Sequence, residues 1–543
     1  MYEIVFRRGL VVDGTGKRGV VTDVAVDDGR IARVGNLEPG IGKNEYDISG
    51  MVIAPGFIDM HSHSDILAFS EPELLPKVMQ GVTSELLGQD GIGPAPLPDN
   101  AAVIASWRSY LAGLDGNPPL AWNWRSLDDY ASELEAAPRG CNLLPLLPQG
   151  NVRMRVMGLE DRKPDEDELR RMEREVELGM AAGAWGISLG MVYMPCVFSQ
   201  HEELVRVFAR AAELGGFLVV HMRNGSTLLL ESLDELFEIS NKADIPLHVS
   251  HFKAAGKRNW NKMSTALEKL EKRHAEGHDV SFDIYPYTAA STMFAILLPP
   301  WVLEGGMQAT LKRLRDPKVR EAIISEWTQP KTPTMKSKGW DNPVHLNGWN
   351  NILISSARSG NGKIVGKRIT EIAAERGISP ALVAFQLMEE EQGDMGVIYF
   401  SMNEDRVAEG IRHPLGMICT DGLLGGTPHP RVYGSFPRVL ARYVRERGEL
   451  TLEEAIYKMT GKPATRLKLE DRGFLLPGLA ADIVVFDPRL IKDTATYDDP
   501  RQFPQGIQHV LVNGVHTVRG GEFTGQLGGR VLRKVSAREN TET

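Results

Sequence analysis

The chain has few cysteines, no long apolar run and no concentration of basic residues. Its three cysteines, Cys141, Cys196 and Cys419, are an odd number without close spacing among 543 residues. That argues against a disulfide framework and against a zinc site built from cysteine. No run approaches the roughly 20 apolar residues of a membrane span, and the first residues lack a basic region followed by an apolar stretch. We therefore expect a cytoplasmic protein without a membrane partner.

The charge balance favours an ordinary globular protein over a nucleic-acid binder. The formal net charge is -9, with 24% charged and 42% hydrophobic residues. Because the basic residues are scattered, the chain lacks the continuous positive surface that follows phosphates, and we expect no nucleic-acid partner. The length predicts more than one domain, whereas nothing in the sequence indicates the oligomeric state.

The two ends of the chain share an alternating pattern that is typical of β-strands. Apolar and polar residues alternate through the first fifty residues, and the same pattern returns in 481–486 and 510–515. We expect the two ends to pair in one small β-sandwich domain, formed by residues 1–54 and 476–530.

The middle of the chain alternates short β-rich runs with helical stretches at 165–182, 202–214, 262–276 and 452–460. This rhythm predicts a parallel sheet with helical crossovers, and eight such runs predict an α/β fold, a (β/α)8 barrel, over residues 55–475. The predicted strands are 52–59, 82–88, 143–148, 186–189, 217–221, 246–251, 279–285 and 416–420.

The last two predicted strands are too far apart for a single crossover. We predict an insertion over about 293–345, near the barrel mouth, which is a candidate lid. A simple surface insertion is the alternative. Beyond it, the polar residues 531–543 are expected to form a mobile tail.

Residue types that bind metals stand at the ends of four predicted strands. His61 and His63 follow the first strand two residues apart, so that both side chains face one side. His221 and His251 close the fifth and sixth strands, and Asp421 follows the eighth. Because a barrel converges the carboxyl ends of its strands, we expect these five side chains to gather in one space as a metal site.

His248 lies in the same strand as His251, an odd number of positions away. On a regular strand the two side chains face opposite ways, so only one of them can be a ligand. We take His251 as the ligand and expect His248 to be a packing histidine whose ring is hydrogen-bonded.

This pattern resembles the amidohydrolase superfamily, in which a β-sandwich from both termini flanks the barrel. Within the superfamily, the chain is similar to the N-acyl-D-amino-acid deacylases (D-aminoacylases). The similarity is carried by the segments 56–63, 250–253, 285–289, 429–438 and 477–482. The His-Pro-Arg block at 429–431 is the most distinctive of them.

The resemblance implies hydrolysis of an amide bond with one or two Zn²⁺ ions per chain. By similarity, His61, His63 and Asp421 hold one metal position, and His221 and His251 hold the other. Asp421 is also the implied catalytic residue, as general base and then general acid. The implied substrate is a small N-acylated amino acid, and its implied binding residues are Tyr193 beside the acyl oxygen and Lys253, Tyr285, Ser291 and Arg431 around the carboxylate.

One position departs from the family's pattern. Those deacylases usually have a cysteine after the second strand, where this chain has Asp90. A carboxylate can also ligate or bridge, but it is a harder ligand than a thiolate, which leaves the number and identity of the metals open. We expect Asp90 to be a metal ligand, with Glu85 as a weaker candidate for the same role.

The predicted function is metal-dependent hydrolysis of N-acyl-D-amino acids or related N-acylated amino acids, although the sequence does not show the chirality, the side chain or the acyl group. A cyclic-amide hydrolase of the hydantoinase or dihydroorotase type, or a D-dipeptidase, is the alternative among enzymes. The fourth strand offers no lysine that could be carboxylated into a bridge, which counts against the cyclic-amide reading. A barrel that has lost catalysis and acts as a binding protein is the alternative of another class.

Overall fold

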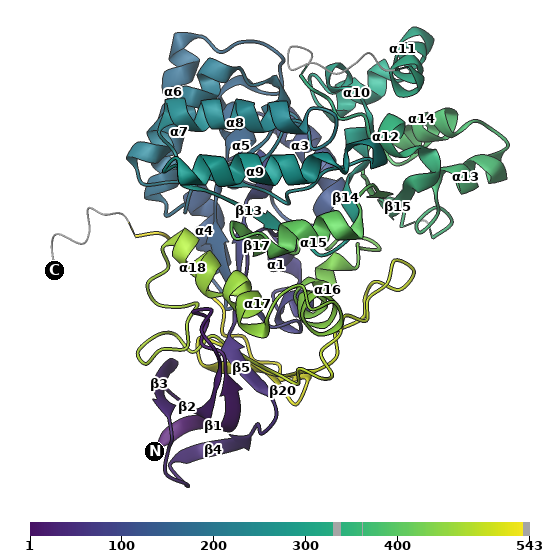
Figure 1. The fold of residues 1–543 in the computed structure, drawn as a ribbon. Helices are drawn as coiled ribbons and strands as arrows, with labels where there is room; N and C mark the ends of the chain where they lie inside the picture. The colour runs from purple at the N-terminus through teal and green to yellow at the C-terminus, as the bar shows by residue number, and fades with distance from the viewer. Residues whose placement is uncertain (330–337, 361, 536–543) are drawn as a thin grey trace.

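The computed structural model describes residues 1–329, 338–360 and 362–535. Figure 1 shows the N-terminal strands beside the C-terminal part of the chain, below a larger body of helices. Within the described residues, nine strands form one sheet, called here the β module. They are β1 (Tyr2–Val11), β2 (Val20–Asp27), β3 (Arg30–Gly35), β4 (Gly42–Asp47), β5 (Val52–Pro55), β18 (Ile483–Phe486), β19 (Ile507–Val512), β20 (Val515–Arg519) and β21 (Glu522–Phe523).

The two ends of the chain meet where β5 pairs with β18 in antiparallel register, with Ile53 opposite Val485. One apolar cluster joins residues from both ends, among them Val24, Ile53, Val485 and Leu511. Burial of these side chains against each other stabilises the pairing. The prediction that the two ends pair is confirmed.

The first predicted barrel strand, 52–59, is in fact two strands. Residues Val52–Pro55 form β5 in the β module, and only Phe57–Asp59, strand β6, joins the barrel by pairing with β7. A Cβ atom on Gly56 would lie 2.2 Å from Thr83 Oγ1, so the chain changes sheets at a point where only glycine fits. Both strands are fully buried, which is why the sequence reads as one apolar run. We propose this junction as the boundary between the two domains.

The barrel strands form two parallel sheets that share the third predicted strand. That strand, 143–148, divides into β8 (Asn142–Pro145), which pairs with β7 (Val82–Leu87), and β9 (Leu147–Pro148), which pairs with β10 (Ile187–Gly190). The sheet continues through β11 (Leu218–His221), β12 (Leu247–Val249), β13 (Val280–Ile284) and β17 (Gly416–Ile418). A parallel bridge between Ser62 and Gly422 closes the ring. The predicted (β/α)8 barrel is confirmed, with its third strand broken.

Helices connect and cover the barrel strands, and Figure 1 shows α6 to α9 layered over one side of it. No helix in the described ranges is long and apolar enough to cross a membrane. The helices outside the insertion are α1 (Leu67–Ser70), α2 (Leu75–Val78), α3 (Ala101–Asp115), α4 (Leu127–Glu135), α5 (Gln149–Met157), α6 (Glu166–Ala181), α7 (His201–Glu213), α8 (Leu229–Ala243), α9 (Lys262–Ala275), α15 (Glu404–Arg412), α16 (Arg431–Arg438), α17 (Leu452–Met459) and α18 (Gly461–Leu467).

The insertion is larger than the predicted 293–345. It begins with β14 (Ala289–Met293) and ends with β16 (Met395–Phe400), and these two strands pair antiparallel. On its other edge, β16 pairs antiparallel with β15 (Ile352–Ala357). Its helices are α10 (Met307–Arg313), α11 (Pro317–Thr328), α12 (Pro343–Asn347), α13 (Ile369–Arg376) and α14 (Pro380–Glu390). The prediction was too narrow because these alternating strands and helices have the same local texture as barrel units. Residues 330–337, inside the predicted range, lie outside the described residues.

The predicted mobile tail, 531–543, begins too early. Leu532 N–H donates to Leu143 O at 2.8 Å, and Lys534 N–H donates to Gly183 O at 2.9 Å. Arg533 adds an ion pair to Glu135 at 2.7 Å. Residues 531–535 are therefore held against the barrel, and the rest of the predicted tail, 536–543, lies outside the described residues.

Candidate metal centre

The strand-end histidines and Asp421 meet at the carboxyl ends of the barrel strands. His61 Nε2 and His63 Nε2 are 3.2 Å apart. Asp421 Oδ1 lies 3.7 Å from His61 Nε2 and 3.5 Å from His63 Nε2. These three buried groups could hold one cation, and they are the set that the resemblance implies for one metal position.

Asp90 stands among four histidines. Its Oδ1 lies 3.6 Å from His61 Nε2 and 3.5 Å from His251 Nε2. Its Oδ2 lies 3.6 Å from His63 Nε2 and 3.6 Å from His221 Nδ1. His61, Asp90 and His251 form a second group that could hold a metal. The carboxylate therefore occupies a bridging position, between the pair from the first strand and the single histidines of the fifth and sixth strands.

Three of these residues have a left-handed backbone conformation that is uncommon outside glycine. The φ angles are 57° at Asp90, 33° at His251 and 47° at Asp421. Each residue directly follows a strand or lies in the turn after it, where the backbone must bend to direct a side chain inward. Such backbone strain is concentrated at functional sites, because surrounding packing must hold it in place.

The donor atoms at this centre fit a metal cation. Asp90 Oδ1 and His221 Nδ1 are buried and have no hydrogen-bond partner among the described residues. An unpaired buried polar atom costs about 1–3 kcal/mol, which a coordinated ion would offset. Imidazole and carboxylate together suit zinc.

The pKa values of His251 and His61 shift in opposite directions, and both shifts are consistent with a site that binds a cation. Burial, with Lys253 and His221 nearby, lowers the pKa of His251 to about 3, so that its ring is neutral and keeps a lone pair for a metal. Burial alone would lower the pKa of His61 as well, but Asp90 and other carboxylates raise it to about 9. A metal ion would replace the proton that this cluster otherwise attracts.

A buried lysine, Lys77, supports the segments that carry the metal ligands, and no pattern in the sequence indicated it. Lys77 Nζ donates to Asp59 Oδ2 at 2.8 Å, to Ser62 Oγ at 2.8 Å and to Thr420 Oγ1 at 2.7 Å. Ser62 lies between the two histidines of the first strand, and Thr420 precedes Asp421. Glu85 accepts from Ser62 Oγ at 2.6 Å and lies 3.4 Å from Lys77 Nζ, so it belongs to this network. In sequence, Lys77 looks like any basic residue of a short helix.

His248 is buried and hydrogen-bonded through both ring nitrogens, as expected. Its Nδ1 lies 2.8 Å from Ser281 Oγ, and its Nε2 lies 2.8 Å from Asp283 Oδ2. Asp283 Oδ1 also accepts from the backbone N–H of His251 at 2.7 Å. The hydrogen-bonded pair of His248 and Asp283 thus fixes the backbone that carries His251. Asp283 could have been identified in the sequence, because polar and apolar residues alternate along strand β13.

Three of the four implied carboxylate-binding residues line a cavity above the metal ligands. Lys253, Tyr285 and Ser291 line it together with Asp421. Arg431 Nη1 lies 2.9 Å from Asp421 Oδ2, and its Nη2 donates to Ser291 O at 3.1 Å. The buried Tyr285 hydroxyl has no hydrogen-bond partner among the described residues, which leaves it able to bind a ligand.

The remaining predicted residue, Tyr193, lines the same cavity beside His221. Their rings are 5.0 Å apart, and the Tyr193 hydroxyl lies 2.9 Å from Thr292 Oγ1. Most of the predicted site residues line this cavity, whereas His61 and Arg431 do not line it and contact the lining residues Asp90 and Asp421. Tyr399, which also lines the cavity, was not predicted because it comes from the insertion.

Comparison with known proteins gives a consistent result. A model of the amidohydrolase family matches residues 44–518. The chain is 33% identical to a D-aminoacylase of Alcaligenes xylosoxydans over 99% of this chain and 98% of that protein. It is 34% identical to an N-acyl-D-glutamate deacylase of the same organism over 94% of this chain and 93% of that protein.

A solved structure extends the comparison to three dimensions. It is an N-acyl-D-glutamate deacylase from Bordetella bronchiseptica, complexed with zinc and a phosphonate inhibitor that mimics the tetrahedral intermediate. The match has a TM-score of 0.81 and 31% identity, and it covers 98% of this chain and 99% of that one. Since the family model spans most of the residues and these relatives align over nearly their whole length, the chain belongs to the amidohydrolase family, with the D-aminoacylases among its relatives.

Proposed function

We propose that this chain is a metal-dependent amidohydrolase that hydrolyses N-acyl-D-amino acids to a carboxylic acid and a D-amino acid. The observation that carries the proposal is the position of Asp421. Its Oδ1 faces His61 and His63, and its Oδ2 pairs with Arg431. One carboxylate thereby joins the metal ligands to a cation suited to the free carboxylate of an amino acid.

Zinc is the proposed ion, in one or two positions per chain. His61, His63 and Asp421 would hold one ion, and His221 and His251 would hold the other, with Asp90 between them. When bound, zinc supplies Lewis acidity toward the scissile carbonyl and makes a water molecule more acidic. The zinc in the related Bordetella deacylase supports this choice. Because Asp90 stands in place of the family's cysteine, the relative zinc affinities of the two positions are expected to be particular to this chain.

Asp421 is the proposed general base and general acid. Burial alone would raise its pKa, but the opposite effect of Arg431 and the neighbouring histidines is larger. The pKa of Asp421 therefore lies below that of an ordinary aspartate. The carboxylate is therefore ionised at neutral pH. Oδ1 can accept a proton from the attacking water and then deliver it to the departing amine.

Substrate orientation is assigned to Arg431, Lys253, Tyr285 and Ser291, and Tyr193 is placed beside the acyl oxygen. Lys253 Nζ donates to His251 O at 2.7 Å and lies 5.8 Å from the centre of the Tyr285 ring. The buried Arg431 and the partly buried Lys253 beside one hydroxyl form a site that favours a carboxylate over a neutral end group. A linear N-acyl amino acid has that free carboxylate, while a hydantoin does not.

The test is a hydrolysis screen of the zinc-loaded protein. N-acetyl amino acids of both enantiomers are compared with a hydantoin and a D-dipeptide. We expect release of the amino acid from the D-enantiomers. Ring opening alone would favour the cyclic-amide hydrolase instead, and a protein that binds no transition metal and shows no metal-stimulated amidase activity would be the inactive barrel.

A cytoplasmic location, a small-molecule substrate and no nucleic-acid partner belong to the same proposal. The cysteines Cys141, Cys196 and Cys419 are buried and form no disulfide. Free buried thiols are typical of reducing compartments. Fractionation of the native cells, with the activity measured in each fraction, tests the location.

A further inference from the structure

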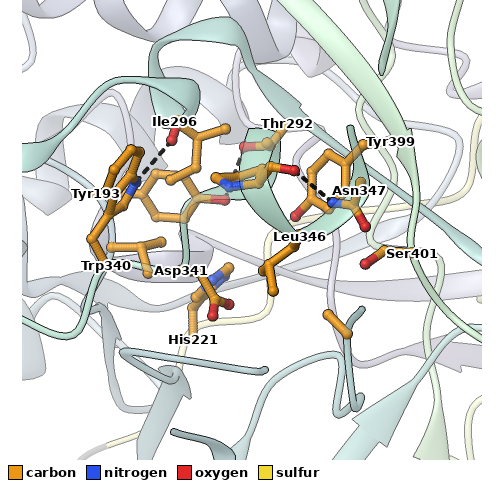
Figure 2. A pocket seen from close by; sticks show the side chains of 13 residues that line it. Tyr193, His221, Thr292, Ile296, Trp340, Asp341, Leu346, Asn347, Tyr399 and Ser401 are labelled. Atoms are coloured by element: carbon orange, nitrogen blue, oxygen red, sulfur yellow. Dashed lines mark hydrogen bonds between the residues drawn. The ribbon is translucent and has the colours of Figure 1, made fainter. Parts of the chain in front are cut away.

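A second cavity adjoins the one above the metal ligands. The two share Tyr193, His221, Thr292 and Tyr399 in their walls. Figure 2 shows the lining residues, which come both from barrel loops and from the insertion. A substituent of a substrate bound at the metal centre can therefore extend into this second cavity.

Apolar side chains form much of the second cavity's wall. Val192, Ile296, Trp340 and Leu346 line it. Trp340 Nε1 donates to Ile296 O at 3.2 Å, which fixes the indole ring against the wall (Figure 2). Such a surface favours an aliphatic chain, by about 25 cal/mol for each Å² removed from water.

Asp341 gives this wall a negative charge. It lines the cavity, and no lysine or arginine is among the described residues that do so. Asp341 accepts from Gly225 N–H at 3.0 Å and from Ser226 Oγ, and it forms no ion pair with another described residue. Burial raises its pKa to about 6, so it is ionised in mildly alkaline buffer.

The second cavity adjoins the groups assigned to the substrate carboxylate. An ideal Cβ on Gly225 would lie 3.8 Å from Lys253 Cγ and 3.9 Å from Asp341 Oδ2, so the two charged residues flank one loop. Ser291 lines the first cavity, and its neighbour in β14, Thr292, lines both cavities. The side chain and the carboxylate of an amino acid share one carbon atom, whereas the acyl group lies beyond the amide nitrogen. Because Lys253 and Asp341 flank one loop, the side chain, which is bonded to the same carbon as the carboxylate, is the substituent assigned to the second cavity, although Tyr193 also lines it.

We propose that Asp341 determines substrate specificity, by selecting N-acyl-D-amino acids whose aliphatic side chain ends in a cation, such as lysine or arginine, and by rejecting anionic side chains. The inference rests on the proposed deacylase function and names its substrate class. The relatives include both a D-aminoacylase and an N-acyl-D-glutamate deacylase at nearly equal identity, so overall similarity does not choose between side chains. The local charge does, because like charges at close range oppose binding and opposite charges favour it.

The test compares substrates that differ only at the tip of the side chain. Nα-acetyl-D-lysine, N-acetyl-D-norleucine and N-acetyl-D-glutamate are hydrolysed by the zinc-loaded protein at about pH 8, where lysine is charged and Asp341 is ionised. We expect kcat/KM for the lysine substrate to exceed that for the glutamate substrate by about tenfold or more. In Asp341→Asn, the ratio of lysine to norleucine should fall about tenfold, with the glutamate substrate gaining relative to norleucine.

Two variants separate selection from support of the loop. Ser226→Ala removes a hydrogen bond to Asp341 but keeps the charge, so it should change all three substrates by a similar factor. Asp161→Asn removes an acid that pairs with Lys338 and does not line the cavity, and it should leave the ratios unchanged. A uniform loss in Asp341→Asn, matching that in Ser226→Ala, would overturn the inference.

The remaining outcomes are equally decisive. A wild-type preference for the glutamate substrate overturns the inference even if Asp341→Asn does not fold. The preference between N-acetyl-D-norleucine and N-octanoyl-D-norleucine is also measured. If Asp341→Asn changes this preference, the cavity takes the acyl group and the inference is overturned. Hydrolysis with unchanged ratios defeats only this inference, whereas no hydrolysis of any N-acyl-D-amino acid defeats the proposed function as well.

Discussion

Histidine rings meet closely in two regions of this molecule, with different results. At the metal centre, His61 Nε2 and His63 Nε2 are 3.2 Å apart. In the β module, His509 Nδ1 and His516 Nε2 are 3.0 Å apart. The module pair packs against aromatic rings, with Tyr46 at 5.0 Å from His509 and 5.4 Å from His516.

The difference lies in the carboxylates. Asp90 and Asp421 stand within 3.7 Å of the histidines at the metal centre, and Asp90 raises the pKa of His61 to about 9. In the β module, burial and the neighbouring cation Arg519 lower the pKa of His516 to about 4. A close pair of imidazoles therefore attracts a cation only where carboxylate oxygens share the space, and otherwise it packs as two neutral rings.

The largest effect should come from Asp421→Asn. Loss of the proton acceptor is expected to lower kcat/KM by about 10³-fold, within the usual range for a general base. The measurement is hydrolysis of an N-acetyl-D-amino acid by zinc-loaded protein, with Tm and zinc content as controls for folding and loading. Activity within a few-fold of wild type would remove Asp421 from the proposed mechanism.

The next effect concerns the carboxylate that distinguishes the two histidine clusters. Asp90→Ala should weaken zinc binding by at least about 10–100-fold, because four histidines lose their shared carboxylate. Asp90→Cys should keep zinc, since a thiolate is also a good ligand. Zinc is measured by titration against a chelator of known affinity.

The matched control for that experiment comes from the β module. His516→Ala removes a ring from the other cluster and should leave zinc binding unchanged. If Asp90→Ala binds zinc as tightly as wild type, Asp90 has no part in holding the metal, and the contrast between the clusters is lost.

The smallest effect is on the pH dependence of stability. Burial lowers the pKa values of His509 and His516 to about 4, against about 6.5 in an unfolded chain. Between these values the unfolded chain binds more protons. The stability from the neutral pair is therefore complete above about pH 6.5 and is lost as the pH falls toward 4, by less than about 1.4 kcal/mol per pH unit for each ring.

Calorimetry between pH 4.5 and 8 checks this prediction. The Tm of His516→Gln should fall less steeply with acidification than that of wild type. His278→Gln, at an exposed loop position, should follow the wild-type curve and serves as the control. Parallel curves for wild type and His516→Gln would show that the module pair does not titrate between its folded and unfolded pKa values.

Much of the barrel could be predicted because its signals are local. Short apolar runs end in His61, His221, His251 and Asp421, and parallel strands bring their carboxyl ends to one rim regardless of the residues between. The break at Gly56 could not be predicted, because strands β5 and β6 are both fully buried and differ only in their partners. The insertion was underestimated for a similar reason, since its strands and helices repeat the local pattern of the barrel.

By itself, the sequence determined which residue types stand at the strand ends and therefore the kind of site this chain can build. Only the tertiary structure decided that Lys77 supports the segments that carry the metal ligands, and that Asp341 of the insertion lines a cavity beside Tyr193. These residues lie far apart in the chain, and their roles depend on which distant groups surround them. Burial and charge pairing are properties of the folded neighbourhood, so no periodicity in the sequence encodes them.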